Sequence, residues 1–155
     1  MKLDSPSLDN TIETRGSVLL EAWKNGRTVR RVRKSNLITT RGLIVMARTI
    51  SEAGTGVTHI ATGSDNTSPS ISDTALGSEA YRDQVTQYQR PGDGSVTFKL
   101  FIGPASANGT TIKEAGLLNA STGGELVARI VFSASEEIVK TSDITAQISW
   151  TITFS

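Results

Sequence analysis

The sequence predicts a mainly β protein, an antiparallel β-sandwich of about seven to eight strands with one α-helix packed on it. Three observations support this. Every even position from Ile144 to Phe154 is apolar and alternates with Thr, Gln or Ser, which is typical of a strand with one buried face. Asn25-Gly26 separates two β-favouring segments as a hairpin turn does. Turn signals recur between short apolar segments at the spacing of a sandwich.

The length of 155 residues allows one domain with its own core, which we place at residues 15–155. Residues 1–14 are polar, and we predict an N-terminal arm that is either frayed or ordered against a neighbour. The first residues lack the apolar core of a signal peptide, and no apolar run approaches the roughly 18 residues of a membrane span. We therefore expect a soluble protein made in the cytoplasm, with no membrane partner.

A basic hairpin is predicted over residues 17–34. The two-residue turn pairs Lys24 with Arg27, and it pairs Glu21 with Arg30 as a favourable cross-strand charge pair. Between Lys24 and Arg48 the chain places eight of its sixteen basic residues and no acid. The candidate protein interface is the basic side chains of the second strand: Arg27, Arg30, Arg31, Arg33 and Lys34.

Three interpretations of this basic strand stay open. The charges protect an edge strand against aggregation, or they contact an acidic protein surface. Contact with nucleic acid is the least favoured, because proteins that bind single strands interleave aromatic side chains with such charges, and only Trp23 could serve here.

A single helix is predicted over residues 40–53. Thr39 or Thr40 supplies the N-cap, and Gly54 and Gly56 supply the stop signals. We expect an apolar stripe at helical spacing to face the sheet: Leu43, Met46, Ala47 and Ile50.

Further short strands are expected after the helix, separated by turn signals such as Asn108-Gly109. They cover residues 57–63, 83–88, 96–100, 111–118, 124–132 and 144–154. Four apolar side chains share one face of the strand at 124–132: Leu126, Ala128, Ile130 and Phe132. The last strand carries the clearest alternation, and we expect it to lie in the middle of the sheet.

Catalytic and metal sites are not indicated. The chain has no Cys and one His, which excludes disulfides, thiolate metal sites and His-rich metal sites. His59 lacks a nucleophile partner and is interpreted as structural. Asp65, Asn66 and Asp73 lack the spacing of a known calcium loop, and no phosphate-binding loop occurs. We expect no catalytic, cofactor-binding or metal-binding residue and no cofactor, in a protein that is not an enzyme.

Several short segments resemble a known family in their order and spacing. The first group is Thr58–Gly63, Pro69, Asp73–Leu76, Glu79 and Arg82. The second group is Ile112–Leu117, Gly124–Ala128 and Val139-Lys140, and the segment that precedes both runs from Asn36 to Leu43. Over roughly residues 36–154 the chain resembles the N-terminal domains of tailed-bacteriophage tail-collar fibre proteins and short free-standing phage tail structural proteins.

The resemblance implies a structural virion protein made in the host cytoplasm. It would act in the tail, baseplate or collar as an adaptor that anchors fibres or neighbouring tail proteins. Other virion proteins would be its partners, and a homo-oligomer, a trimer or a higher ring, would match the symmetry of what it joins. Two alternatives are a capsid decoration (cement) protein and a receptor- or glycan-binding tail module.

Three charged residues of these segments are candidates for a structural ion pair: Glu79, Arg82 and Glu114. We hypothesise that Arg82 pairs with one of the two carboxylates inside the fold. Removing one partner of a buried pair costs on the order of 3–5 kcal/mol, so such a pair would support the fold.

Overall fold

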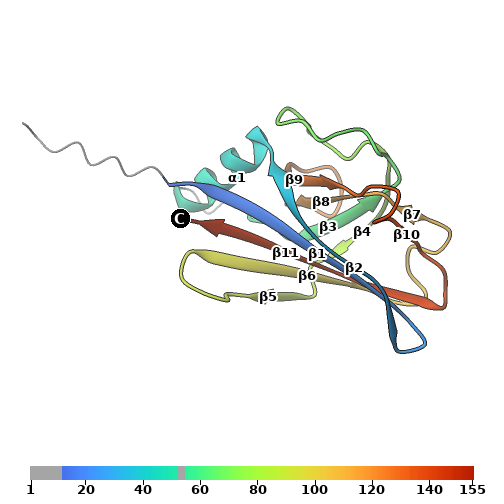
Figure 1. The fold of residues 1–155 in the computed structure, drawn as a ribbon. Coiled ribbons are helices and arrows are strands. Elements are labelled where there is room, and N and C mark those ends of the chain that lie inside the picture. Colours follow the sequence, from blue (N-terminus) through green and yellow to red (C-terminus); the bar gives the residue numbers. More distant parts are fainter. Residues whose placement is uncertain (1–11, 52–54) are drawn as a thin grey trace, which may run out of the picture.

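The computed structural model describes residues 12–51 and 55–155, which form eleven strands and one helix (Figure 1). The helix α1 spans Thr40–Ser51. Residues 52–54, where the sequence predicts the end of the helix, lie outside the described residues. The strands are β1 Thr14–Lys24, β2 Arg27–Ile38, β3 His59–Gly63, β4 Glu79–Gln84, β5 Gln87–Gln89, β6 Ser95–Ile102, β7 Thr111–Ile112, β8 Glu114–Leu118, β9 Leu126–Val131, β10 Ile138–Val139 and β11 Ile144–Phe154.

Nine of these strands form one antiparallel sheet in the order β4-β3-β8-β9-β2-β1-β11-β6-β5, and β10 pairs with β7. The sheet curls, so that β1, β6 and β11 share one hydrophobic core with β3, β8 and β9. The predicted mainly β class with one helix is confirmed. A sandwich of separate sheets and a count of seven to eight strands are not confirmed. The main sheet is continuous because β2 pairs with β1 along most of its length and with β9 at its end.

The last strand, β11, lies in the middle of one half of the sheet, between β1 and β6. Trp150 is fully buried, opposite Val18 of β1 and Phe98 of β6. Burying such a side chain stabilises the folded state by roughly 1.5–3 kcal/mol before the loss of conformational entropy is counted. The predicted alternation is confirmed up to Ile152, whereas Phe154 is 39% exposed at the end of the strand.

Of the arm expected at residues 1–14, residues 1–11 lie outside the described residues. Glu13 is described, and it exchanges two backbone hydrogen bonds with Ser155, at 2.7 and 3.0 Å. Thr14 then begins β1, so β1 and β11, the first and last strands in chain order, are neighbours in the sheet.

The predicted hairpin turn is present, but the predicted charge pair is wrong. Asn25-Gly26 adopts positive φ at both residues, as the favoured two-residue turn requires. A bulge then shifts the register of β1 and β2 around Val29. Glu21 consequently stands opposite Arg31, with which it forms an ion pair, and Arg30 stands opposite the buried Ala22.

Thr39 begins the helix as the sequence predicts. Its hydroxyl oxygen accepts the N–H of Gly42 at 3.0 Å, and its carbonyl accepts the N–H of Leu43. Thr39 is fully buried, and its hydroxyl also donates to the carbonyl of Leu126. The same residue therefore caps α1 and attaches the helix to β9.

The buried face of α1 differs from the predicted stripe. Leu43 is 51% and Ile50 is 89% exposed, and Ala47 is exposed as well. Met46 alone of the four packs partly against the core. The buried helical residues are Gly42 and Val45.

The reason is a close approach of the helix backbone to β9. A Cβ atom added to Gly42 would lie 2.1 Å from the carbonyl oxygen of Val127, well inside van der Waals contact. A glycine is required there because no side chain fits. Because the helix contacts the sheet through Gly42, the side chains of Leu43, Ala47 and Ile50 lie to one side of this contact and stay exposed.

Replacing Gly42 with Ala should lower the free energy of unfolding by about 1–3 kcal/mol, the usual cost of overpacking. In a free helix Ala is more favourable than Gly by about 1 kcal/mol, so a net loss isolates the clash with Val127. Gly56→Ala is the matched control, because its nearest neighbour would be 3.9 Å away, and we expect no loss. Urea denaturation measures both variants, and equal stability would contradict the close approach.

Candidate functional site

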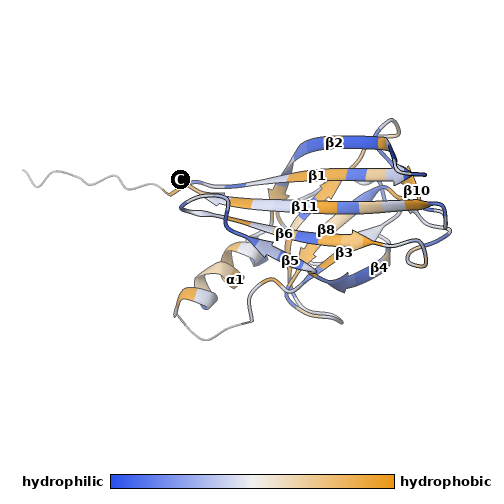
Figure 2. Ribbon diagram, turned by 90° about the horizontal axis from the view of Figure 1, so that it is seen from below, coloured by the Kyte–Doolittle hydropathy of each residue, from blue (hydrophilic) through white to orange (hydrophobic). Residues whose placement is uncertain are grey.

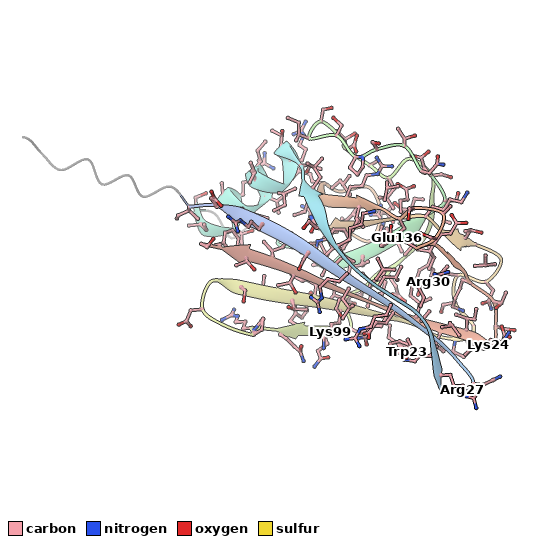
Figure 3. The ribbon with its side chains drawn as sticks, in the orientation of Figure 1. Trp23, Lys24, Arg27, Arg30, Lys99 and Glu136 are labelled. Carbon is pink, nitrogen blue, oxygen red and sulfur yellow. The ribbon has the colours of Figure 1, made fainter. Side chains whose placement is uncertain are left out.

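The candidate interface lies on β2, which is largely hydrophilic along its length (Figure 2). The structure divides its five basic residues into two groups. Arg27, Arg31 and Arg33 are exposed, whereas Arg30 and Lys34 are half-buried. Figure 3 shows Arg27 at the tip of the hairpin and Arg30 on the side of β2 that faces Glu136.

The half-buried pair ties β2 to the segment after β9. Lys34 Nζ donates to the carbonyl of Val131 at 3.1 Å and to the carboxylate of Glu136 at 2.9 Å. Arg30 donates to the carbonyl of Ser135. The N–H of Ser133 and then Lys34 hold the pKa of Glu136 below its ordinary value. These two basic side chains therefore have internal partners.

The exposed group is different. Arg31 lies 3.5 Å from Glu21, with a side chain that is 67% exposed, and such pairs contribute little. Arg27 and Arg33 have no carboxylate within 4 Å among the described residues. The three exposed arginines of β2, Arg27, Arg31 and Arg33, are therefore available to a partner.

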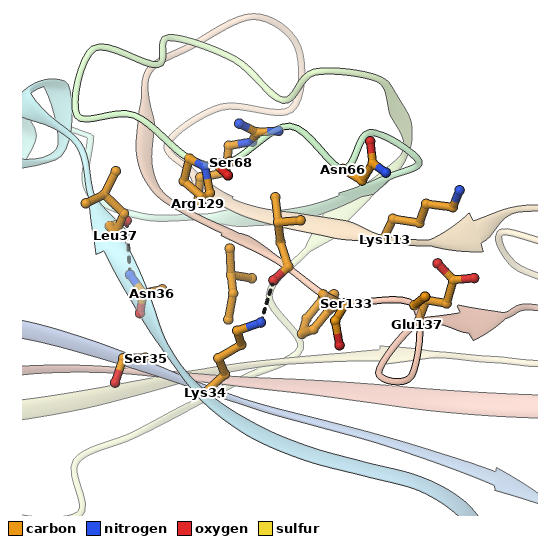
Figure 4. Close-up of a pocket in the computed structure, with 15 residues that line it drawn as sticks. Lys34, Ser35, Asn36, Leu37, Asn66, Ser68, Lys113, Arg129, Ser133 and Glu137 are labelled. Atoms are coloured by element: carbon orange, nitrogen blue, oxygen red, sulfur yellow. Dashed lines mark hydrogen bonds between the residues drawn. The ribbon is translucent and has the colours of Figure 1, made fainter.

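A cleft opens beside β2. β2 pairs with β9 only at Leu37 and Ile38, and beyond this point the two strands diverge. The cleft between them has a volume of about 750 Å³. Lys34 spans it to reach the carbonyl of Val131 (Figure 4). Other polar side chains on its walls are Ser35, Asn36, Asn66, Ser68, Lys113, Ser133 and Glu137.

Next to the cleft, Arg129 forms the centre of a buried ion cluster. Its side chain is 4% exposed and donates to three carboxylates, each at 2.9 Å: those of Glu114, Asp73 and Asp65. Burial by itself would lower the pKa of Arg129, but the bonds to Asp73 and Glu114 outweigh burial and raise it. Asp65 and Asp73, considered above as calcium ligands, are the partners of this guanidinium.

Glu114 is fully buried and has a complete set of donors. Besides Arg129, its carboxylate accepts the backbone N–H groups of Gly77 at 3.0 Å, Ser78 at 2.7 Å and Asp65 at 3.3 Å. A Cβ on Gly63 would lie 2.5 Å from the same carboxylate. The segment between β3 and β4 is thereby attached to β8 and β9.

The predicted ion-pair residues fall into two clusters. Arg82 makes two hydrogen bonds to Glu79, at 2.7 and 2.8 Å, and two to the carbonyls of Ala120 and Gly123, both at 2.8 Å. Glu114 is instead bound to Arg129, which the sequence reasoning missed. The available signal was that Arg129 is the one charged residue inside the apolar run from Leu126 to Phe132.

Lys140, in one of the resembling segments, is also fully buried. Its Nζ donates to the side chain of Asn108 and to the carbonyl of Thr141, both at 2.9 Å. Burial lowers the pKa of this ammonium. Lys140 therefore supports the neighbouring loop and offers no surface to a ligand.

Within the described residues, no group of three or more His, Asp or Glu side chains could hold a metal ion. His59 contacts the hydroxyl of Thr58 through Nδ1 at 2.8 Å. The helix α1 is shorter and less apolar than a membrane-spanning helix. Comparison of the chain with protein-family models, curated proteins and solved structures found no match.

Replacing Arg129 with Met should destabilise the fold by about 3–5 kcal/mol, because Glu114 would keep its buried charge without the guanidinium. The matched control is Arg31→Met, where an exposed pair is lost and we expect less than about 1 kcal/mol. Thermal and urea unfolding measure both. Similar losses in the two variants would show that the cluster does not support the fold.

A second prediction concerns Asp143, whose carboxylate lies 2.7 Å from the ammonium of Lys24 at the end of the hairpin. The bonds from Lys24 and then Thr141 lower its pKa to about 2. Because the folded-state pKa is depressed, this stabilisation is present above pH about 4 and is lost as the pH falls through about 2. NMR titration should show the low value, and Lys24→Met should raise it. An unchanged titration in the variant would contradict the pairing.

Proposed function

We propose that this chain is a structural, non-catalytic protein that docks onto a neighbouring protein through Arg27, Arg31 and Arg33. The observation that carries the proposal is that these side chains stay exposed while the other two basic residues of β2 have internal partners. They project from a long strand whose position is set by β1 on one side. Such a surface can meet a partner without reorganising.

The charge of the surface indicates the partner. β2 carries no acidic residue, and Glu21 is the one carboxylate within 4 Å of its exposed arginines in the described part of the chain. A negative surface would be attracted to this strand, and complementary charge raises the rate of association and excludes like-charged partners. An acidic protein surface is therefore the proposed partner.

Within this class, we propose an adaptor in the tail, baseplate or collar of a tailed bacteriophage, which anchors fibres or neighbouring tail proteins in the virion. Support comes from the sequence segments that resemble collar-fibre domains. Asp73 and Glu114 come from separate segments of that set and both bind Arg129, and Gly63, from a third segment, lies against Glu114. The curled sheet takes the place of the expected β-sandwich, since its halves enclose one core. A trimer or higher ring would match the symmetry of a tail.

Changing Arg27, Arg31 and Arg33 together to Ser should reduce incorporation into particles at least about tenfold, because the attractive charge is removed. The matched control changes three exposed arginines elsewhere, Arg41, Arg48 and Arg90, to Ser. Quantitative mass spectrometry of purified particles measures incorporation, and circular dichroism checks that both variants fold.

Binding of the unmodified protein should also weaken between 0.1 and 1 M salt, where the Debye length falls from about 10 to about 3 Å. Normal incorporation of the β2 variant would overturn the proposed docking surface. Cross-linking of intact particles would identify the neighbour, and copies at capsid symmetry axes would indicate a decoration protein instead.

A further inference from the structure

We propose that an extended, acidic segment of the partner protein binds in the cleft beside β2 as an added strand. Its backbone would pair with that of β2 at Arg31, Arg33 and Ser35. This inference rests on the proposed function and deepens it, because it specifies how β2 holds its partner. It depends on the direction of the unpaired backbone groups of β2 and on the cleft that they face.

The direction follows from the last part of the strand. Thr39, directly after β2, donates its backbone N–H to the carbonyl of Val127 in β9 at 3.0 Å. In an antiparallel strand the backbone groups of every second residue face the same neighbour. The bulge lies before Arg30, so this alternation holds along the rest of β2. The residues that share the direction of Thr39 are Leu37, Ser35, Arg33 and Arg31.

Leu37 uses this direction to pair with β9, but the residues before it do not. From Arg27 to Asn36, β2 has β1 as its one strand partner among the described residues. The N–H and C=O groups of Ser35 therefore point into the cleft, and those of Arg33 and Arg31 continue the same unpaired edge beyond it. Extended peptides bind other proteins through such free strand edges, where main-chain hydrogen bonds supply the affinity.

The cleft is open on the side that a strand would enter. Ser35 is exposed, whereas Lys34 lies on the opposite face of β2, where its register partner is the fully buried Val18. By this register, the contact of Lys34 with Val131 lies on the core side of the cleft. The outer side is where an incoming segment would lie, and the cleft as a whole has a volume of about 750 Å³.

The charges at the cleft select an acidic segment. Three of the four charged residues that line the cleft are basic, Lys34, Lys113 and Arg129, and the fourth is Glu137. Lys113 and the nearby Arg33 of β2 have no carboxylate within 4 Å among the described residues. Side chains of an added strand would alternate between the two faces and place carboxylates next to them. A second copy of β2 would instead place arginines against arginines, so the charge pattern disfavours self-pairing.

The outer edges of the sheet give a contrast. The strands at these edges, β4 and β5, have six and three residues, and short edge strands are a common protection against unwanted pairing. The open stretch of β2 is longer and lies inside the strand order of the sheet. This position favours a specific partner over general edge pairing.

The probe is a synthetic peptide of about eight residues, the length of an ordinary strand, in which Thr and Glu alternate. A peptide of alternating Thr and Lys is the control. NMR titration of the full chain should show binding of the acidic peptide, with slower hydrogen exchange at the amides of Arg31, Arg33 and Ser35. The basic peptide should leave these amides unchanged.

Ser35→Pro removes one cleft-facing N–H and leaves the pairing with β1 intact, because proline is tolerated where a strand N–H faces outward. The substitution should weaken binding of the acidic peptide at least about tenfold, because main-chain hydrogen bonds supply the affinity. The control Ser35→Ala keeps the N–H and should bind normally. Urea denaturation checks that both variants fold. If Ser35→Pro does not fold, Arg33→Pro is compared with Arg33→Ala, which also lacks the charge but keeps the N–H.

Three results would overturn strand addition: no binding of the acidic peptide at millimolar concentration, equal affinity of Ser35→Pro and Ser35→Ala, or protection of the same amides by oligothymidylate but not by peptide. The proposed function is tested separately. If the variant with Ser at Arg27, Arg31 and Arg33 fails to enter particles while Ser35→Pro enters normally, docking through β2 stands and strand addition falls.

Discussion

The hydrogen-bonded ion pair between Arg129 and Glu114 is the contact on which the β3–β9 half of the molecule depends. Both side chains are almost completely buried, and removing a charge from water costs several kcal/mol per ion. The charges are stable there because each of the three guanidinium nitrogens of Arg129 and both oxygens of Glu114 have partners. The helix also packs against β9 at Val127, and the end of β2 pairs with β9. The cluster therefore fixes the position of the strand that forms one wall of the cleft.

The basic residues of β2 are divided between contacts within the fold and the proposed docking surface. The bulge at Val29 turns Arg30 toward the interior side, where it joins Lys34 in holding the segment after β9. Arg31 and Arg33 consequently share the outer face. Two of the five basic side chains, Arg30 and Lys34, stabilise the position of the strand, and the other three stay exposed. A long basic strand next to an open cleft is therefore compatible with the proposed docking surface.

Patterns that depend on neighbouring residues were predictable. The alternation in β11, the turn at Asn25-Gly26 and the cap at Thr39 each require a few residues whose preferences act locally. The buried face of α1 was not predictable from the sequence. Gly42 faces β9 because the helix backbone lies so close to the sheet that no side chain fits between them. The same holds for the candidate site. The basic residues were visible in the sequence. Which of them would bind groups within the fold depended on a single-residue bulge and on the path of the chain after β9.

The sequence by itself determined the mainly β class, the single helix and the concentration of positive charge on β2, because composition and periodicity act over short distances. It also indicated Glu114 and Arg82 as structural charges. Only the tertiary structure decided that Glu114 binds Arg129 and that Arg82 binds Glu79. It likewise decided that β2 separates from β9 and leaves its backbone groups facing a cleft. These features join residues far apart in the chain, and such pairings are chosen by packing and desolvation of the whole fold.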